Sequence, residues 1–224
     1  MKTFPLRSRS RKRGYTLTEV LIALGISVAL GGAATWFMME GARASLKATN
    51  NSVNDLAQWS IFVAISVDSK TANGMSVYST FTPADMADST KRLNKDGRGN
   101  VLILTKSSQD AGSSRAAYDK ITGYIYSPTT KNLRKFEYTV TAAEKGDLAT
   151  NVLPATLEEI LVNNYTTLVP HIIGENLTPP VTGFGVFLVR ERGHSGILSI
   201  EAAQGIDART VNKKLIEASF FIRG

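Results

Sequence analysis

Residues 20–39 read VLIALGISVALGGAATWFMM, which are twenty consecutive residues without a charge. At a rise of about 1.5 Å per residue, a helix of this length extends about 30 Å and matches the hydrocarbon core of a bilayer. Glu19 precedes the stretch and Glu40 follows it. The stretch therefore predicts a membrane-spanning helix close to the start of the chain.

The segment before this helix is strongly basic. Residues 1–14 hold six of the 26 lysines and arginines and no acidic residue, so the other 210 residues carry 20 basic and 19 acidic side chains. A nucleic-acid-binding domain normally carries its cations on the folded body, and we therefore predict no specific nucleic acid partner. By the positive-inside rule, the basic segment stays in the cytoplasm and everything after residue 39 lies across the membrane.

Simpler interpretations of the apolar stretch compete with a specialised anchor. It could be a cleavable secretory signal with the small residues 31–34 as its cleavage region, or the uncleaved anchor of an unrelated periplasmic domain. A buried core helix fits neither the length nor the flanking cations. The first two interpretations leave Glu19 unexplained, because a carboxylate drawn to the bilayer centre costs about 2.5–3.5 kcal/mol and such residues usually have a function.

The residues around Glu19 read Arg11-Lys12-Arg13-Gly14-Tyr15-Thr16-Leu17-Thr18-Glu19 and continue into the apolar stretch. This order of basic residues, glycine, aromatic residue, Thr-Leu pair and glutamate resembles the prepilin signature of the type IV pilin superfamily. That superfamily comprises type IV pilins and the pseudopilins of type II secretion and of competence. One departure is Tyr15, where the family more often has phenylalanine, and this change is conservative.

The resemblance implies processing and partners. A prepilin peptidase would cut between Gly14 and Tyr15 and methylate the new amino group of Tyr15, so that residues 1–14 are a cleaved leader. Glycine before the cut has a physical reason, since a side chain there would obstruct the approach of the peptidase to the backbone. Glu19 would be the filament-assembly acid that pairs with the Tyr15 amine of a neighbouring subunit. Other pilin or pseudopilin subunits, an inner-membrane assembly platform and membrane lipid are the further expected partners.

The helix is expected to continue beyond the membrane and to occupy residues 15–69. Apolar residues recur in steps of three, four and seven, which is typical of one helix face, and Asn73-Gly74 is a stop signal. We expect this apolar stripe to carry the globular domain. Its members are Leu46, Val53, Leu56, Val63 and Val67, with Ala57, Ile61 and Ala64 beside them.

Residues 70–224 change to a period-two pattern, which predicts strands. The expected strands are residues 101–104, a hairpin of 123–126 with 136–140, a second pair of 184–189 with 197–201, and a closing strand at 216–222. Thr156 and Glu159 have the spacing of a capping box for a short helix. The predicted fold is α+β, with a long N-terminal helix packed against one antiparallel sheet.

The globular region shows no recognisable catalytic pattern. The chain has no cysteine, which excludes disulfides and thiolate metal sites, and neither His171 nor His194 has a partner at ligand spacing. We therefore expect no catalytic residue, no cofactor, no metal and no enzyme activity.

The expected function is a structural subunit of a type IV pilus or a type II secretion pseudopilus. The chain would be a single-pass protein of the inner membrane, with its globular domain periplasmic or extracellular and part of a filament after assembly. A looser resemblance to J-type pseudopilins and W-type minor pilins rests on Tyr126, Leu133-Arg134 and the final strand from Phe220 to Arg223, and it implies a minor subunit that helps to initiate or cap the filament. Retention of Glu19 argues against the K-type pseudopilin. The alternative is a membrane-anchored or secreted periplasmic domain, which could be an enzyme, with an ordinary signal peptide.

Overall fold

The computed structural model describes residues 15–222 except 109–116, 148–149, 151, 181–184, 192–193 and 205–211. Gly14 and the rest of the predicted leader therefore lie outside the described residues. The chain divides into two compact units, Met1–Thr49 and Asn50–Gly224.

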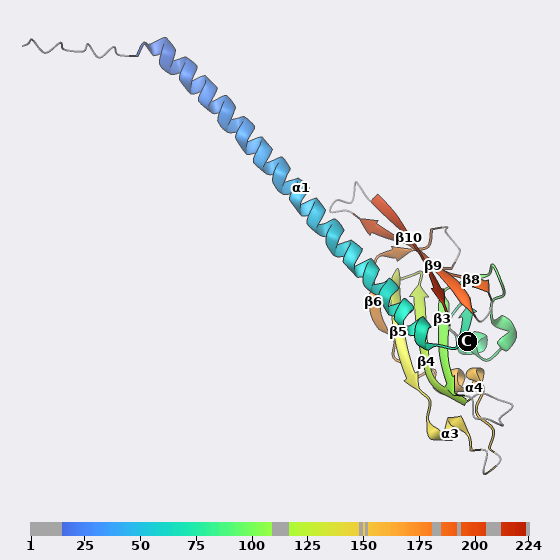
Figure 1. The fold of residues 1–224 in the computed structure, drawn as a ribbon. Helices are drawn as coiled ribbons and strands as arrows, with labels where there is room; N and C mark the ends of the chain where they lie inside the picture. Colours follow the sequence, from blue (N-terminus) through green and yellow to red (C-terminus); the bar gives the residue numbers. More distant parts are fainter. Residues whose placement is uncertain are drawn as a thin grey trace, which may run out of the picture. The chain divides into compact units, whose positions relative to one another are not determined.

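Helix α1 (Leu17–Thr71) is 55 residues long and confirms the predicted long N-terminal helix (Figure 1). Its end coincides with the predicted stop signal. Asn73 leaves the helix and joins the sheet, because its backbone N–H donates to the Thr105 carbonyl at 2.9 Å and its side chain exchanges hydrogen bonds of 2.7 and 2.8 Å with the Ser107 backbone.

The first sheet, called sheet A, has five antiparallel strands in the order β1-β3-β4-β5-β6 (Figure 1). These strands are β1 (Gly74–Tyr78), β3 (Val101–Ser108), β4 (Ala117–Ser127), β5 (Asn132–Thr139) and β6 (His171–Gly174). The predicted first hairpin is confirmed, since β4 pairs with β5 across a short turn.

A second sheet, called sheet B, has the order β10-β9-β8-β2, and β7 also pairs with β9. Its strands are β2 (Arg98–Gly99), β7 (Leu177–Thr178), β8 (Phe187–Glu191), β9 (Ser195–Gln204) and β10 (Asn212–Phe221). The second predicted pair is present as β8 and β9. The prediction of one sheet is wrong because the period-two pattern identifies strands but not their partners, and β8 pairs with the two-residue strand β2 instead of extending sheet A.

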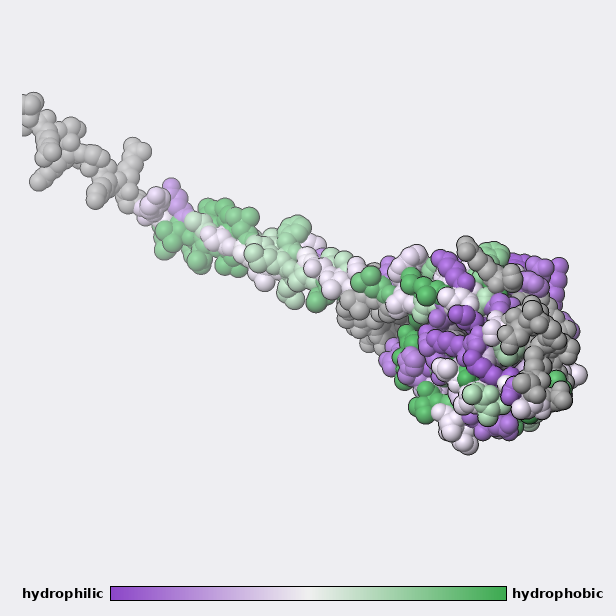
Figure 2. All heavy atoms as spheres, turned by 60° about the horizontal axis from the view of Figure 1, so that its bottom comes forward, coloured by the Kyte–Doolittle hydropathy of each residue, from purple (hydrophilic) through white to green (hydrophobic). Residues whose placement is uncertain are grey.

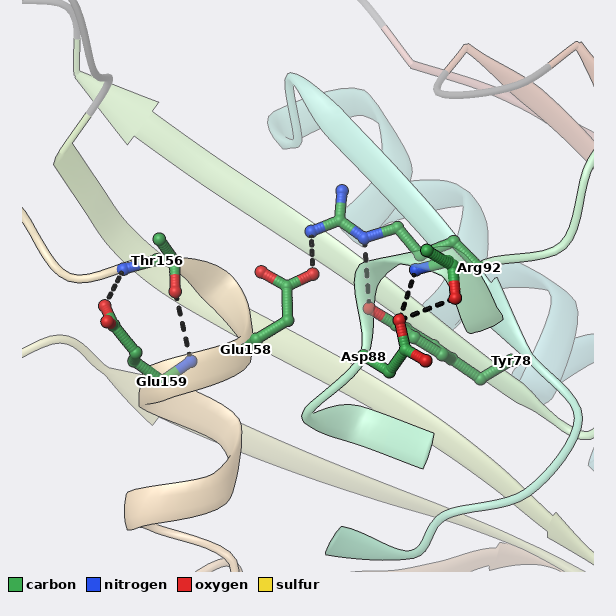
Figure 3. Close-up of polar contacts among 7 residues, drawn as sticks. Tyr78, Asp88, Arg92, Thr156, Glu158 and Glu159 are labelled. Carbon is green, nitrogen blue, oxygen red and sulfur yellow. Dashed lines mark hydrogen bonds and ion pairs between the residues drawn. The ribbon is translucent and has the colours of Figure 1, made fainter. Parts of the chain in front are cut away.

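Short helices complete the described elements: α2 (Pro83–Met86), the 3₁₀ turn η1 (Ser89–Lys91), α3 (Ala142–Lys145) and α4 (Leu157–Asn163). The predicted capping box of α4 is confirmed. Thr156 N–H donates to Glu159 Oε2 at 2.7 Å, and Glu159 N–H donates to Thr156 Oγ1 at 3.3 Å (Figure 3).

Sheet A is the middle layer of the globular part and has a hydrophobic core on each face. Leu102 and Leu104 point to the core shared with α1 and sheet B, whereas Val101 and Ile103 point to the core shared with α2 and α4. The run of four apolar residues at 101–104 is explained by this arrangement, since both faces of β3 are buried.

The face of α1 that packs on the core agrees only in part with the predicted stripe, which named Ile61 as a flanking residue. Ile61 and Ile65 are buried in the core with sheets A and B, and Ser69 on the same side is also buried. Val63 and Val67, which were expected to carry the globular domain, are exposed instead. The helix is apolar on two faces, and periodicity does not show which of them the sheet covers.

An ionic network also joins α1 to sheet A. Lys135 Nζ on β5 lies 2.8 Å from Asp68 Oδ2 on α1 and 2.6 Å from Glu137 Oε1. The Tyr124 hydroxyl on β4 donates to Asp68 Oδ2 at 2.5 Å. Burial and the Asp68 carboxylate both raise the pKa of Tyr124, so this phenol stays protonated and remains a donor.

Two glycines are required where backbone or ring atoms come close. A Cβ on Gly123 would lie 2.0 Å from the Phe136 ring, which covers this position from the paired strand. A Cβ on Gly185 would lie 2.2 Å from the backbone of Gly99, where the segment before β8 passes β2. These contacts give a packing reason for glycines that have no ligand-binding pattern.

Candidate processing and assembly site

The predicted cleavage and methylation site is at the start of α1. Gly14 lies outside the described residues, while Tyr15 is exposed and precedes the first helical residue, Leu17. Among the described residues, no hydrogen bond joins Tyr15 to Glu19. The roles of Gly14, Tyr15 and Glu19 in processing and assembly therefore stay predictions.

The structure brings Glu19 together with Thr16 instead. Thr16 N–H and the Thr16 hydroxyl donate to Glu19 Oε2 at 2.8 and 3.0 Å. Glu19 N–H in turn donates to Thr16 Oγ1 at 3.3 Å. These reciprocal bonds form a capping box, with Thr16 just before the helix and Glu19 in its first turn.

This capping box has a chemical consequence at a membrane surface. The first N–H groups of a helix have no partner within the helix, and an unsatisfied N–H is costly next to lipid. Thr16 and Glu19 satisfy two of these groups within the chain. The described contacts use Oε2 of the carboxylate, and no described residue donates to Oε1. Thr16 was not predicted as the cap of this helix, although Thr-x-x-Glu is a recognised capping signature.

The helical segment after Glu19 is suited to a membrane. Among the described residues, Leu17–Thr49 is the segment long and apolar enough to cross one, and its apolar side chains are exposed (Figure 2). Its hydroxyl groups are satisfied within the helix, since Ser27 donates to the Ala23 carbonyl at 2.8 Å and Thr35 to the Gly31 carbonyl at 2.6 Å. Such internal bonds let polar residues enter an apolar environment.

The part of α1 in the second unit carries an exposed apolar face opposite its buried face. We call Leu56, Trp59, Val63 and Val67 the outer apolar face. These residues follow one another in steps of three, four and four and are between 39% and 67% exposed. The core-facing residues Ile61 and Ile65 lie on the other side of the helix. The aligned exposed residues mark a surface suited to contact with another molecule.

A polar cluster of the globular part joins a short helix to the first strand of sheet A. Arg92 donates to the Tyr78 hydroxyl at 3.2 Å and forms an ion pair with Glu158 at the start of α4 (Figure 3). Burial raises the pKa of Tyr78, although Arg92 acts in the opposite direction. Asp88 accepts a 2.8 Å hydrogen bond from Thr90 N–H and caps η1. These contacts join α4, β1 and η1 on one face of sheet A.

The structure also places the other residues that the sequence singled out. Tyr126 and Leu133 face each other in the β4–β5 hairpin, and Arg134 pairs with Ile172 on β6. Phe220 is buried, whereas Arg223 lies outside the described residues. His171 begins β6 and His194 precedes β9, and both are exposed. Within the described part of the chain, no three histidine or acidic side chains are grouped to hold a metal ion.

Comparison with known proteins identifies the N-terminal part. A family model described as the prokaryotic N-terminal methylation motif matches residues 9–35. No curated protein and no solved structure matches the chain. The motif implies processing by a prepilin peptidase and assembly with other pilins, and the apolar helix fits an inner-membrane anchor. Because this motif leads into a long N-terminal apolar helix followed by antiparallel sheets, the chain is consistent with a type IV pilin-like protein.

Proposed function

We propose that this chain is a structural, non-catalytic subunit of a type IV pilus or a type II secretion pseudopilus. The methylation motif at residues 9–35 and the apolar helix support this function. Under this proposal, a prepilin peptidase removes residues 1–14 and methylates Tyr15. An inner-membrane assembly platform then receives the mature chain, whose globular part is periplasmic until it enters the filament.

The outer apolar face of α1 is the observation that carries the filament role. Fully burying one large apolar side chain contributes about 1.5–3 kcal/mol, and these four are already partly covered, so each retains part of that amount for association. Exposed apolar residues scattered singly are ordinary on a protein surface. The outer apolar face instead aligns four such residues on one side of the helix, opposite the side that is already packed. This alignment supports contact with the apolar surface of another subunit.

We further propose a minor subunit that helps to initiate or cap the filament. Residues 70–224 comprise 155 residues, a larger globular part than in the typical major type II pseudopilin, and no cysteine is present to close the C-terminal disulfide loop of many major pilins. The loose resemblance to J-type pseudopilins and W-type minor pilins agrees with the same assignment.

A charge placed on the outer apolar face tests the filament role. Val67→Glu should fold, lose its leader and enter the membrane as the wild type does, because Val67 is exposed. Its recovery in filaments sheared from the cells should fall at least about tenfold, since burying an unpaired carboxylate is costly. Val169→Glu is the matched control, because Val169 is an exposed valine in the loop before β6. Equal recovery of the two variants would contradict the proposed use of this face.

Sequencing the mature N-terminus separates the proposal from its alternative. A methylated Tyr15 as first residue supports a pilin-like subunit. A first residue near Ala34 supports a secreted protein with an ordinary signal peptide.

A further inference from the structure

The outer end of the membrane helix carries two aromatic residues directly before its first charges. The rings of Trp36 and Phe37 are exposed and meet edge to face, with centroids 5.1 Å apart and planes at 70°. Glu40 and Arg43 follow and form an exposed ion pair at 3.7 Å. Within the first unit, most of the surface of both side chains is left uncovered.

We propose that Trp36 and Phe37 anchor the helix at the membrane–water interface on the side away from the cytoplasm. The headgroup and ester region of the lipid is their partner there. An indole ring combines a large apolar surface with one N–H donor, so it favours a region that offers both acyl chains and carbonyl acceptors. The purely apolar middle of a bilayer offers no acceptor, and bulk water leaves the rings uncovered. This inference rests on the membrane anchor alone and does not depend on filament assembly.

The spacing along the helix supports this position of the interface. From Trp36 to Glu40 the helix rises about 6 Å. The interfacial region on one side of a bilayer is about 5–8 Å thick, which is half the difference between the total thickness and the hydrocarbon core. If the Trp36 ring lies at the border of the hydrocarbon, the Glu40–Arg43 pair reaches water, where an ion pair needs no burial.

The same position also accounts for the inner end of the helix. Twenty residues before Trp36, or about 30 Å, the helix reaches Thr16. The Thr16–Glu19 capping box and the Tyr15 phenol then lie at the inner interface, where water and headgroups can satisfy their remaining hydrogen bonds. Aromatic residues with polar tips therefore flank the span at both borders, as is typical of membrane helices.

Depth-dependent fluorescence quenching of the full chain in phosphatidylcholine/phosphatidylglycerol vesicles tests this proposal. Trp59→Phe leaves Trp36 as the single tryptophan, because the chain has two. Lipids brominated near the ester end of the acyl chain should quench Trp36 roughly twofold more than lipids brominated near the methyl end, as expected for an interfacial indole. The matched control is Leu30→Trp in a chain that also carries Trp36→Phe and Trp59→Phe. Its indole lies about 9 Å deeper along the helix and should show the opposite order.

Each result has one meaning. The two opposite quenching orders support an interfacial anchor at Trp36. If Trp36 and the Leu30→Trp indole are both quenched best from the methyl end, the aromatic pair lies in the hydrocarbon and the proposal is wrong. If bromolipids quench the Leu30→Trp indole but not Trp36, the pair lies in water and the proposal is also wrong. Absence of quenching in both chains overturns the proposal together with the membrane anchor on which it rests.

Discussion

Replacing Asp68 by alanine removes the carboxylate that joins α1 to sheet A. Asp68 accepts hydrogen bonds from the Tyr124 hydroxyl at 2.5 Å and from Lys135 Nζ at 2.8 Å. The Asp68 and Lys135 side chains are only 16% and 14% exposed. The variant therefore leaves a buried hydroxyl and a mostly buried ammonium group without this acceptor, while Lys135 keeps its second partner Glu137.

The size of the effect follows from these contacts. A hydrogen bond to a charged group contributes about 1.5–3 kcal/mol, and a buried donor left without an acceptor costs about 1–3 kcal/mol. Because water still reaches part of the ion pair and Glu137 remains, we take the lower half of these ranges. The expected loss for Asp68→Ala is about 3 kcal/mol of the free energy of unfolding, a large part of the 5–15 kcal/mol typical of a domain.

Urea denaturation of residues 44–224, which lack the membrane helix, measures this loss by circular dichroism. The midpoint should fall without a change in the slope. A double-mutant cycle of Asp68→Ala with Lys135→Met should give a coupling energy of about 1–2 kcal/mol. The control cycle, Lys120→Met with Glu137→Gln, tests a pair whose side chains are 40% and 42% exposed, and it should give a smaller coupling energy of at most about 1 kcal/mol. Equal coupling in the two cycles would refute the reasoning that burial decides the strength of these pairs.

Four further predictions concern processing, packing, pH and assembly. Gly14→Val should block removal of the leader, so that in cells with the peptidase the variant runs on a gel at the size of the uncleaved chain, fourteen residues longer than the mature one. Normal processing would contradict the predicted cleavage between Gly14 and Tyr15. Gly123→Ala should destabilise the same fragment, residues 44–224, by about 2–3 kcal/mol, because its Cβ overlaps the Phe136 ring; an unchanged urea midpoint would exclude this packing. Hydrogen bonds from Lys120 and then Lys135 lower the pKa of Glu137 to about 2. Its contribution to the free energy of unfolding is therefore present above its ordinary pKa of 4.5 and is lost as the pH falls towards 2. Glu137→Gln should flatten the fall in unfolding free energy over this window, and parallel pH curves for variant and wild type would argue against it. Glu19→Gln should be processed and inserted normally but recovered poorly in sheared filaments, and wild-type recovery would make the charge of Glu19 dispensable.

The sequence predicted the elements of the globular part better than their partners. The strand at residues 101–104 could be predicted because four consecutive apolar residues need two buried faces, and the structure provides both. The existence of sheet B could not be predicted, because β2 has only two residues, Arg98 and Gly99, and gives no periodic signal. Which partner a strand takes depends on contacts between distant parts of the chain, and a local pattern does not contain them.

The long helix shows the same limit in a different form. Its apolar residues predicted a packed face, but the helix is apolar on two sides and the packed side contains Ile61 and Ile65. Hydrophobic periodicity reports that a face avoids water and does not identify what covers it. The proposed filament subunit would need both faces, because one packs within the chain and the other would contact a neighbour.

The capping box gives Glu19 a role within its own chain in addition to the proposed role in assembly. Glutamine can replace glutamate in a capping box, since its side-chain carbonyl also accepts the Thr16 N–H. Glu19→Gln therefore keeps the start of the helix and removes only the negative charge. Glu19→Ala removes both and loses about 0.5–2 kcal/mol of helix capping as well. A filament defect shared by both variants would arise from the missing charge, because only that charge can pair with the amine of a neighbouring Tyr15. A defect confined to Glu19→Ala, and reproduced by Thr16→Val, would instead mean that assembly depends on a well-formed start of α1.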